Sequence, residues 1–339
     1  MRISWSSPRH TAAATAMELS PALRAAIALF ATSPAAAPAF LHIYSTTTST
    51  PSATSSATSN ADATATIDRQ QQPCTHLHVL DSSFNPPTTA HLALARSSLA
   101  ASPPPRPPTG SSSPAPRRLL LLLSAHNADK PASPATLLER LEMMHRLSLS
   151  LGPQLPPDVG VDIGLTKHAR FVDKSQALAA AYPPAQHHHH QQPPPQQPQQ
   201  TFLLGFDTLV RLLDPRYYPA PLHVPCAAPL AALQPFFARA RVRCTLRGED
   251  VPAQHAYLER IRRGERLAEG YQPAWAACIE LVDAPVEAVG VSSSLVRDAR
   301  RSFSHSRSEQ AAEVDEVLQR CLTPEVAAYV LGQGLYLDG

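Results

Sequence analysis

The sequence predicts an α/β protein with a doubly wound parallel sheet. Short apolar runs, such as LHVL at residues 77–80, lack the polar alternation of strands that face water on one side. Segments with helical spacing of apolar residues separate these runs, and HLALARSSLAA at residues 91–101 is the first of them. With 43% apolar residues among 339, the chain can also bury a large core. Strands of this kind joined by helices form parallel sheets that are covered on both faces.

The same alternation continues along the chain, so each later element can be assigned in order. Further strands are expected at residues 117–125, 161–165, 201–206, 242–247 and 278–285. Further helices are expected at residues 136–151, at residues 171–182, after Ser294, and from Thr323-Pro324-Glu325 onwards. Sheets of this class bind ligands at the carboxyl ends of their strands, which makes the segments after each strand the places to search for a site.

Three segments contain too few large apolar residues to offset the entropy of ordering them. They lie at residues 45–72, 102–116 and 183–200. The last two interrupt regular elements, so they are interpreted as low-complexity insertions within one domain. The expected organisation is an N-terminal helical extension that could pack on the core (1–44), a disordered Ser/Thr-rich segment (45–72), and one α/β domain (73–339) that contains both insertions.

The first 30 residues admit two interpretations. Three arginines among alanines and serines resemble a mitochondrial presequence. Glu18, and the pair Ser20-Pro21 ahead of apolar residues, instead favour an ordinary helix from Pro21 to Phe30. The helix is the preferred interpretation, and it predicts a protein of the cytoplasm and/or the nucleus rather than of the mitochondrion.

Composition argues against several classes of protein. The formal net charge is +2 and no Lys/Arg stripe could follow a phosphate backbone, so nucleic acid is not an expected partner. No apolar run approaches the roughly 18 to 20 residues of a membrane span, so no membrane is expected as a partner. The five cysteines never occur as CxxC, which predicts neither a disulfide framework nor a zinc site.

The stretch DSSFNPPTTAH, residues 81–91, directly follows the first strand. Thr88 and His91 lie three residues apart at a helix start, so their side chains share one face. An imidazole at this place can donate a hydrogen bond to a phosphate oxygen. Neither GxGxxG after the first strand nor GxxxxGK[ST] anywhere is present, so a phosphate site would be built from residues such as these.

Three segments resemble those of one superfamily. FNPPTTAHL at residues 84–92 looks like the first signature of the nucleotidylyltransferases. It resembles the form that has Thr rather than His three residues before the histidine. VSSSLVR at residues 291–297 is similar to their second signature, ISSTxIR, and LLGFDTL at residues 203–209 resembles the Gly-x-Asp segment between them. The three segments occur in the same order as in that superfamily. The sequence DSSFNPP most resembles that of fungal nicotinamide mononucleotide adenylyltransferase-like proteins. The resemblance spans Leu77 to about Leu337 and implies a Rossmann-like nucleotidylyltransferase fold.

The resemblance implies roles for particular residues. The catalytic residues that it implies are His91, Thr88 and Arg297. The implied ATP-binding residues are Ser83, Phe84, His91, Gly205, Asp207, Ser293, Ser294 and Arg297. The implied partners are ATP and a pyridine mononucleotide, with Mg²⁺ as a cofactor held mainly by the ATP phosphates. The carboxylate of Asp207 would accept from a ribose hydroxyl, although it could also cap the following helix.

The acceptor site is where the sequence departs from the family. Residues expected there are Ser82, Ser83, Lys130, Arg170 and Phe171. Ser82 replaces a usual glycine, so either the turn differs or a hydroxyl is added to the site. Relatives commonly stack the pyridine ring on a tryptophan, but neither Trp5 nor Trp275 lies at that place, so Phe171 is expected to stack instead.

Two cations of this region have open roles. Lys174 could join Arg170 in binding the acceptor phosphate. Lys130 would lie near the leaving group or the acceptor phosphate, or else be a solvated loop lysine.

The expected activity is transfer of AMP from ATP to nicotinamide or nicotinate mononucleotide, which gives a dinucleotide and pyrophosphate. Two alternatives stay open. One is nucleotidyl transfer to another acceptor, such as phosphopantetheine or, with CTP as donor, a phosphoalcohol. The other is an ATP-binding or ATPase-like interaction protein whose Pro- and Gln-rich segments recruit partners.

Overall fold

The computed structural model describes residues 21–33, 39–46, 74–101, 117–125, 134–182, 197–218, 229–248, 250–303 and 308–337. Several expectations fall outside these residues. The part of the chain outside these ranges includes Lys130, so its role stays a prediction, and residues 1–20, which bear on the possible presequence. It also includes the insertion at 102–116 and most of the low-complexity segments at 45–72 and 183–200.

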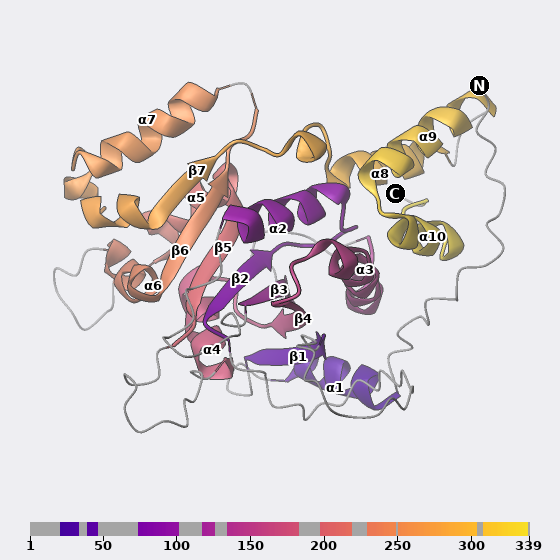
Figure 1. Ribbon diagram of the computed structural model, residues 1–339, viewed down its shortest axis with the longest axis horizontal. Helices are drawn as coiled ribbons and strands as arrows, with labels where there is room; N and C mark the ends of the chain where they lie inside the picture. The colour runs from indigo at the N-terminus through magenta and orange to yellow at the C-terminus, as the bar shows by residue number, and fades with distance from the viewer. Residues whose placement is uncertain are drawn as a thin grey trace.

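A seven-stranded sheet forms the centre of the described fold (Figure 1). Its spatial order is β1-β4-β3-β2-β5-β6-β7, and all neighbours are parallel except β1, which pairs antiparallel with β4. The strands are β1 Phe40–Ser45, β2 His76–Asp81, β3 Arg117–Ser124, β4 Val159–Thr166, β5 Gln199–Gly205, β6 Ala240–Thr245 and β7 Ile279–Val282. The six parallel strands run 3-2-1-4-5-6 in chain order, which is a doubly wound order. The predicted fold class is confirmed.

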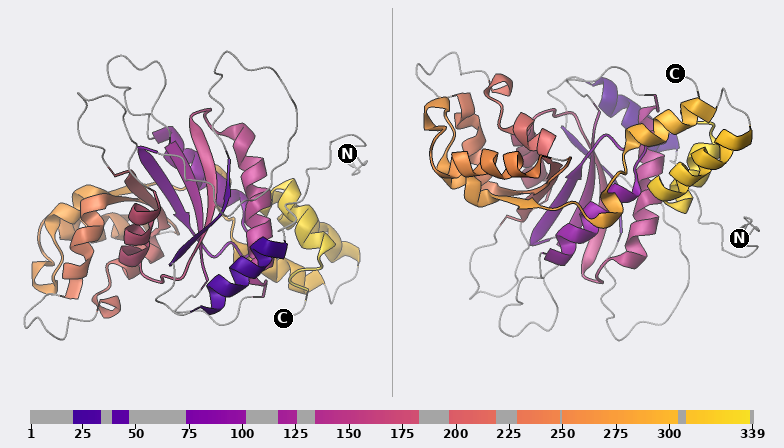
Figure 2. Two further views of the ribbon diagram at one scale, coloured as in Figure 1. Left: turned by 90° about the horizontal axis from the view of Figure 1, so that it is seen from below. Right: turned by 90° about the horizontal axis from the view of Figure 1, so that it is seen from above.

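Helices cover both sides of this sheet (Figure 2). They are α1 Pro21–Thr32, α2 Thr89–Ala101, α3 Leu137–Leu151, α4 Phe171–Ala181, α5 Phe206–Leu212, α6 Gln234–Arg239, α7 Val251–Arg262, α8 Ser293–Phe303, α9 Ser308–Cys321 and α10 Pro324–Gly332. The predicted helices are present, and α3 begins with a capping box in which Thr136 and Glu139 satisfy each other's backbone N–H groups. Sequence analysis missed α6, α7 and α9.

The two faces of the sheet form two separate cores. Along β3, Leu119, Leu121 and Leu123 pack with α1, α2, α3 and the C-terminal helices, whereas Leu120 and Leu122 pack with α4, α5 and α6. All five leucines are fully buried. This alternation explains the continuous apolar run, because a strand buried on both faces needs an apolar residue at every position.

The N-terminal region contributes a strand that sequence analysis missed. β1 lies within the residues expected to be a helical extension and the start of the disordered segment, and it extends the sheet beyond β4. The preceding helix α1 buries Leu23, Ile27 and Phe30 on the first core. At the other insertion, residues 199–200 belong to β5 rather than to a disordered segment. Their backbones pair with β2, which polar side chains do not prevent.

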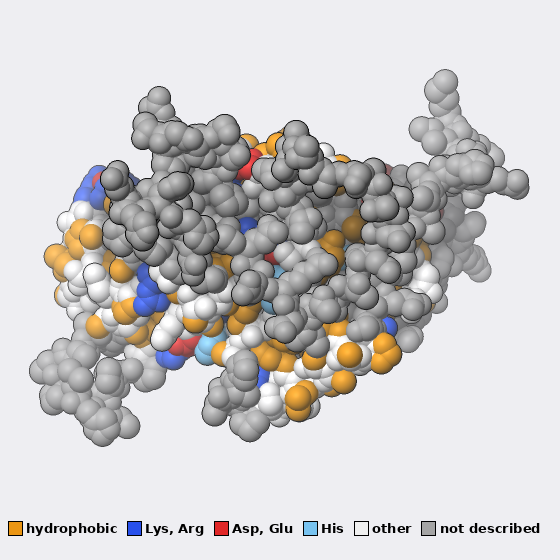
Figure 3. Space-filling view, turned by 60° about the horizontal axis from the view of Figure 1, so that its bottom comes forward, with side chains coloured by type: hydrophobic (Ala, Val, Ile, Leu, Met, Phe, Trp, Pro, Cys, Tyr) orange, Lys and Arg blue, Asp and Glu red, His pale blue; other side chains and the backbone are white. Residues whose placement is uncertain are grey.

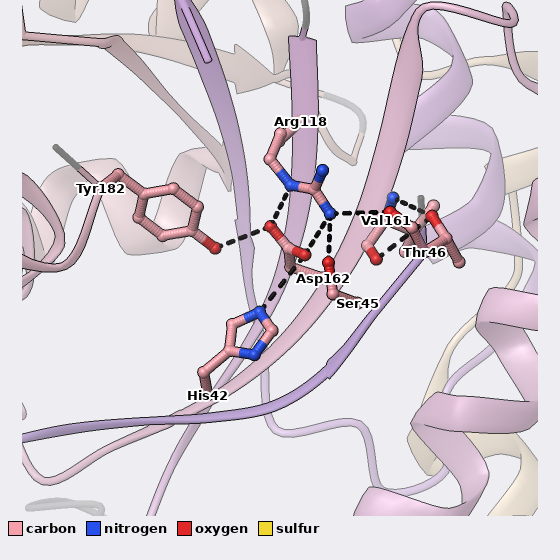
Figure 4. A network of polar contacts seen from close by, with 7 residues as sticks. All are labelled: His42, Ser45, Thr46, Arg118, Val161, Asp162 and Tyr182. Atoms are coloured by element: carbon pink, nitrogen blue, oxygen red, sulfur yellow. Dashed lines mark hydrogen bonds and ion pairs between the residues drawn. The ribbon is translucent and has the colours of Figure 1, made fainter. Parts of the chain in front are cut away.

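A buried carboxylate joins β1 to the sheet (Figure 4). Asp162 of β4 is 1% exposed and accepts from Arg118 Nε at 2.5 Å and from the Tyr182 hydroxyl at 2.9 Å. His42 Nε2 of β1 lies 3.3 Å from the same carboxylate, and Arg118 Nη2 also donates to Ser45 Oγ at 2.5 Å. Burial alone would raise the pKa of Asp162, but hydrogen bonds from His42 and Arg118 outweigh it and lower the pKa. The carboxylate therefore stays ionised and can hold three strands together.

The described surface mixes side-chain types. On the face brought forward in Figure 3, blue basic groups are separated by orange and white ones rather than gathered in one stripe. Within the described ranges, no helix combines the length and the apolar character needed to cross a bilayer.

The stability of the fold is expected to fall on mild acidification. Burial, followed by neighbouring charges, lowers the pKa of His78 to about 3 and that of His145 to about 4. In the unfolded chain both would titrate near about 6.5, so between roughly pH 6.5 and 4 the unfolded state binds more protons. The free energy of unfolding should then drop by about 1.4 kcal/mol per pH unit for each such histidine.

Urea unfolding at pH 7 and pH 5 would measure this dependence. His78→Gln should reduce the slope by about one proton, because glutamine does not titrate. An unchanged slope in His78→Gln would contradict the assignment.

Candidate active site

A pocket of about 420 Å³ opens where the strand order reverses, at the carboxyl ends of β2 and β5. This is the place where doubly wound sheets bind ligands. Gly205 and several aliphatic residues line it, and the polar and aromatic lining residues are Asp81, Ser82, Ser83, His91, Ser124, Arg140, Arg170, Phe171, Lys174, Asp207, Thr208, Arg211, Tyr217, Tyr218 and Arg247. The pocket thus brings together His91 of the first signature, the Gly-x-Asp segment and four of the expected acceptor residues, which are Ser82, Ser83, Arg170 and Phe171.

His91 is held with a defined tautomer. Its Nδ1 lies 3.0 Å from the backbone N of Thr88 and 2.9 Å from Thr88 Oγ1, and its Nε2 lies 2.9 Å from Ser82 Oγ. A backbone N–H can only donate, so Nδ1 accepts and the neutral ring carries its proton on Nε2. Burial, and then the charge of Arg247, lower the pKa of His91 to about 4. At neutral pH His91 is therefore an uncharged N–H donor at the pocket wall.

Ser82 contributes its hydroxyl rather than its backbone. Its N–H donates to the carbonyl of Leu122 on β3 at 3.2 Å, so this backbone donor is already used within the sheet. The hydroxyl meets His91, which agrees with the second of the two possibilities considered for a serine in place of glycine. Phe84 has φ of 46° and is fully buried, and its ring packs 5.1 Å from that of His91 instead of lining the pocket. This left-handed conformation is uncommon for a bulky residue and turns the chain sharply.

The second signature lies against the first. At the start of α8, Ser293 Oγ donates to the carbonyl of Pro86 at 2.7 Å. Arg297 Nη1 donates to the carbonyl of Asn85 at 2.6 Å, and its Nη2 lies 2.9 Å from Ser294 Oγ. The structure therefore brings the two signatures together, as sequence analysis implies. The three residues of the second signature hold the FNPP loop and each other, and they do not line the pocket.

Two further residues hold the same loop and belong to no signature. Arg140 Nε of α3 donates to the carbonyl of Ser83 at 2.7 Å. The Tyr336 hydroxyl, near the C-terminal end of the described chain, donates to Asn85 Oδ1 at 2.7 Å. Sequence analysis could not find either residue, because each contact joins segments that are far apart along the chain.

Gly205 and Asp207 begin α5. The N-cap of this helix is Gly205, so the suggestion that Asp207 caps it is wrong. Asp207 lies in the first helical turn with an exposed side chain that lines the pocket. A Cβ on Gly205 would lie 3.2 Å from Arg247 Nε, so the glycine leaves room for that guanidinium.

The acceptor side of the pocket differs in part from expectation. Phe171 lines the wall, with its ring 5.7 Å from Phe202 and with Lys174 Nζ 4.8 Å from its centre. Lys174 lines the pocket but is 5% exposed, and its ammonium lies 2.5 Å from Asp81 Oδ2, so this carboxylate already balances its charge. A role of Lys174 in binding the acceptor phosphate stays a prediction. Arg170 pairs with Asp173 at 2.8 Å but stays 44% exposed at the pocket.

Trp275 is not a stacking residue of the site. It is 3% exposed in the second core, where it stacks on Phe237. The missed pocket residues include three cations, which are Arg140, Arg211 and Arg247. One pattern could have indicated Arg247, because it is the last residue of the strand predicted at residues 242–247, whose carboxyl end lies at the ligand-binding edge.

The pocket contains no preformed cage for a metal ion. Asp81 and Asp207 are its acidic residues, and Asp81 is paired with Lys174. In the part of the chain that the structure describes, no three His, Cys, Asp or Glu side chains gather as ligands. The acidic residues of the pocket therefore could not hold a metal ion without further ligands from a substrate or water.

Comparison with known proteins places the chain in a family. No family model matches it. A curated protein of Schizosaccharomyces pombe, named "Putative nicotinamide mononucleotide adenylyltransferase", is 34% identical over 227 residues, which make up 66% of this chain and 75% of that protein. Two solved structures of Plasmodium falciparum nicotinic acid mononucleotide adenylyltransferase, complexed with NaAD and with APC, are each 11% identical. Each covers 77% of this chain and 97% of its own, with TM-scores of 0.44 and 0.43.

The sequence relationship with the S. pombe protein is the finding that decides the family, because it covers three quarters of that protein at 34% identity. His91 of the first signature and the Gly-x-Asp segment line one pocket of a doubly wound sheet, and the second signature holds the FNPP loop beside it. The chain belongs to the nicotinamide mononucleotide adenylyltransferase family of the nucleotidylyltransferase superfamily.

Proposed function

We propose that this protein transfers AMP from ATP to nicotinamide or nicotinate mononucleotide and releases pyrophosphate. The observation that carries the proposal is a neutral His91 donor in a cationic pocket at the switch point of the sheet. Five basic side chains line this pocket against two carboxylates. They are Arg140, Arg170, Lys174, Arg211 and Arg247, against Asp81 and Asp207. Two anionic nucleotides fit such an environment.

The chemistry requires positioning and charge stabilisation. The phosphate of the mononucleotide attacks the α-phosphorus of ATP, a new P–O bond forms, and the bond to pyrophosphate breaks with its electron pair on the leaving oxygen. The attacking phosphate is already ionised at neutral pH, so no general base is needed. His91 Nε2–H can donate to the phosphate oxygens on which charge grows, and Thr88 fixes the tautomer that makes this possible.

The remaining residues take roles on either side of His91. Asp207 accepts from a ribose hydroxyl of ATP, and Gly205 keeps the backbone close to it. Ser83 and Phe84 shape the loop beneath the phosphates, which Ser293, Ser294 and Arg297 support from α8. Phe171 and Arg170 form the wall for the acceptor, together with the Ser82 hydroxyl. Magnesium enters as the Mg²⁺–ATP substrate, because phosphates and water supply most of its ligands.

The direct test is an assay of the purified protein with Mg²⁺–ATP and either nicotinamide or nicotinate mononucleotide. Dinucleotide and pyrophosphate are expected in equal amounts from at least one acceptor, measured by chromatography with mass detection. No dinucleotide from either acceptor would overturn the proposal. Phosphopantetheine, and CTP with a phosphoalcohol, belong in the same panel. Phosphate release from ATP that no acceptor changes would point instead to an ATPase-like interaction protein.

A further inference from the structure

The loop between β4 and α4 leads directly to the acceptor side of the pocket. It comprises residues 166–170 and is called the acceptor loop below. Ala169 and Arg170 of this loop line the pocket, and so does Phe171, where α4 begins. Arg170 pairs with Asp173, only three residues later, so this ion pair orients the guanidinium without tying the start of the loop to another part of the fold. Other contacts must hold the loop where it leaves β4.

The N-terminal part of the chain holds the first half of this loop. The N-terminal element contains α1 and β1 and consists of residues 21–33 and 39–46. In it, the carbonyl of Ala39 accepts from the Lys167 N–H at 3.0 Å and from Thr166 Oγ1 at 3.0 Å. The same Thr166 oxygen accepts from the His168 N–H at 3.2 Å. One carbonyl ahead of β1 thus fixes the backbone of Lys167 directly and that of His168 through Thr166.

Lys167 makes a second connection, to the end of α1. Its ammonium donates to the carbonyl of Ser33 at 3.1 Å and to Ser33 Oγ at 2.6 Å. It also lies 4.8 Å from the centre of the Phe30 ring, which is buried in the first core. A cation is favourable both over an aromatic ring and at the carboxyl end of a helix. The acceptor loop is therefore joined to a segment that lies 134 residues earlier in the chain.

On its other side the acceptor loop contacts the end of β3. The Ala125 N–H donates to the carbonyl of Thr166 at 2.8 Å, and Ser124 Oγ donates to the carbonyl of His168 at 3.3 Å. Ser124 also lines the pocket. The loop is thus held between the sheet and the N-terminal element, and its last residues face the ligand.

We infer that the N-terminal element supports the acceptor site, and that Lys167 is the positioning residue that connects it to the pocket wall. The inference deepens the proposed function, on which it rests for the identity of the acceptor. Residues that contact a ligand depend on the shell that holds them, so a weaker connection at Lys167 should weaken acceptor binding. The ATP side of the pocket, at Asp207 and His91, should not be affected.

Isothermal titration with nicotinamide mononucleotide and with nicotinate mononucleotide measures this effect. Lys167→Met should bind the acceptor about 3- to 10-fold more weakly than the unaltered protein, because it loses the charged hydrogen bonds to Ser33. Lys167→Arg, which keeps a cationic donor, should lose less. The affinity for Mg²⁺–ATP should not change in either variant. In steady-state assays, the KM for the mononucleotide should rise in Lys167→Met while kcat and the KM for ATP stay the same.

Ser33→Ala separates support of the loop from direct contact with the ligand. Neither Ser33 nor Lys167 lines the pocket. Ser33→Ala should weaken mononucleotide binding by a smaller factor than Lys167→Met, and the two changes together should be no weaker than Lys167→Met alone. Losses that add in the double variant would show that Lys167 does not act through Ser33, and its assignment as the connecting residue would fail.

The matched control is Thr46→Val, just beyond the opposite end of β1. Thr46 Oγ1 accepts from the Val161 N–H at 2.8 Å (Figure 4). The control therefore removes a side-chain hydrogen bond between the same N-terminal element and the same strand β4, but away from the carboxyl end where the pocket lies. It should lower the thermal unfolding temperature about as much as Lys167→Met does and bind both mononucleotides normally. Equal losses of mononucleotide affinity in the two variants would leave only a general stabilising role for the N-terminal element, against the inference.

Two results in Lys167→Met would also refute the inference. One is an unchanged mononucleotide affinity, and the other is an equal loss for ATP and the mononucleotide. If the protein binds a mononucleotide with this dependence on Lys167 but forms no dinucleotide, the proposed function fails while the role of Lys167 stands. If the unaltered protein binds neither mononucleotide, both fail.

Discussion

His91→Ala is expected to lower the rate of dinucleotide formation by about 10²- to 10³-fold, because it removes a preorganised N–H donor from the reacting phosphates. Folding should change little, since His91 is only half-buried and its polar contacts are with neighbours of the same loop. Steady-state rates at saturating substrates, with thermal unfolding followed by circular dichroism, measure the two effects separately.

A second variant separates the donor from the bulk of the ring. In His91→Gln an amide N–H lies about as far from the backbone as Nε2 does, so this variant should be faster than His91→Ala. His255→Ala on the exposed face of α7 is the matched control and should retain full activity. Full activity in His91→Ala would remove this residue from the mechanism.

The expected pH dependence follows from the tautomer. With a pKa of about 4, His91 gains a proton only in acid, so its state does not change between pH 6 and pH 8. If the rate instead changed with pH around pH 6.5, and this change were absent in His91→Gln, His91 would not be a neutral donor throughout this range.

Asp162→Ala is expected to reduce the free energy of unfolding by about 3 to 5 kcal/mol. The substitution leaves Arg118, which is 2% exposed, without its counter-charge, and it removes acceptors from Tyr182 and His42. Urea unfolding at pH 7 measures the loss.

Two comparisons make this result specific. Asp298→Ala removes an exposed partner of Arg301 on α8 and should cost within about 1 kcal/mol. Replacing both members of the buried pair, by Arg118→Met with Asp162→Leu, should recover much of the loss, because no charge is left buried alone. Equal costs for Asp162→Ala and Asp298→Ala would show that the network adds nothing.

The sequence predicts those features that depend on local pattern. The parallel strands could be predicted because burial on both faces requires continuous apolar residues, as in Leu119 to Leu123. The common face of Thr88 and His91 follows from helical spacing, and the structure joins them at 2.9 Å.

Features that depend on long-range pairing could not be predicted in this way. Nothing in FLHIYS indicates that it pairs with β4, about 120 residues later in the chain. The acid partner of Lys174 is Asp81, which lies 93 residues earlier, so its balanced charge is invisible in the local sequence. The position of Arg247 at the end of a predicted strand is a local signal, but its neighbours in the pocket come from other strands and could not be predicted.

The contacts of Arg297 and Tyr336 with the FNPP loop affect the order in which parts of the molecule form. Arg297 and Tyr336 reach Asn85 across 212 and 251 residues, and contacts so distant in sequence must overcome a large loop-closure entropy before they form. As the chain leaves the ribosome, strands β2 to β7 can pair before Tyr336 has been added. The catalytic loop is thus secured only at a late stage of synthesis, and a nascent chain can have a complete sheet well before it has a complete active site.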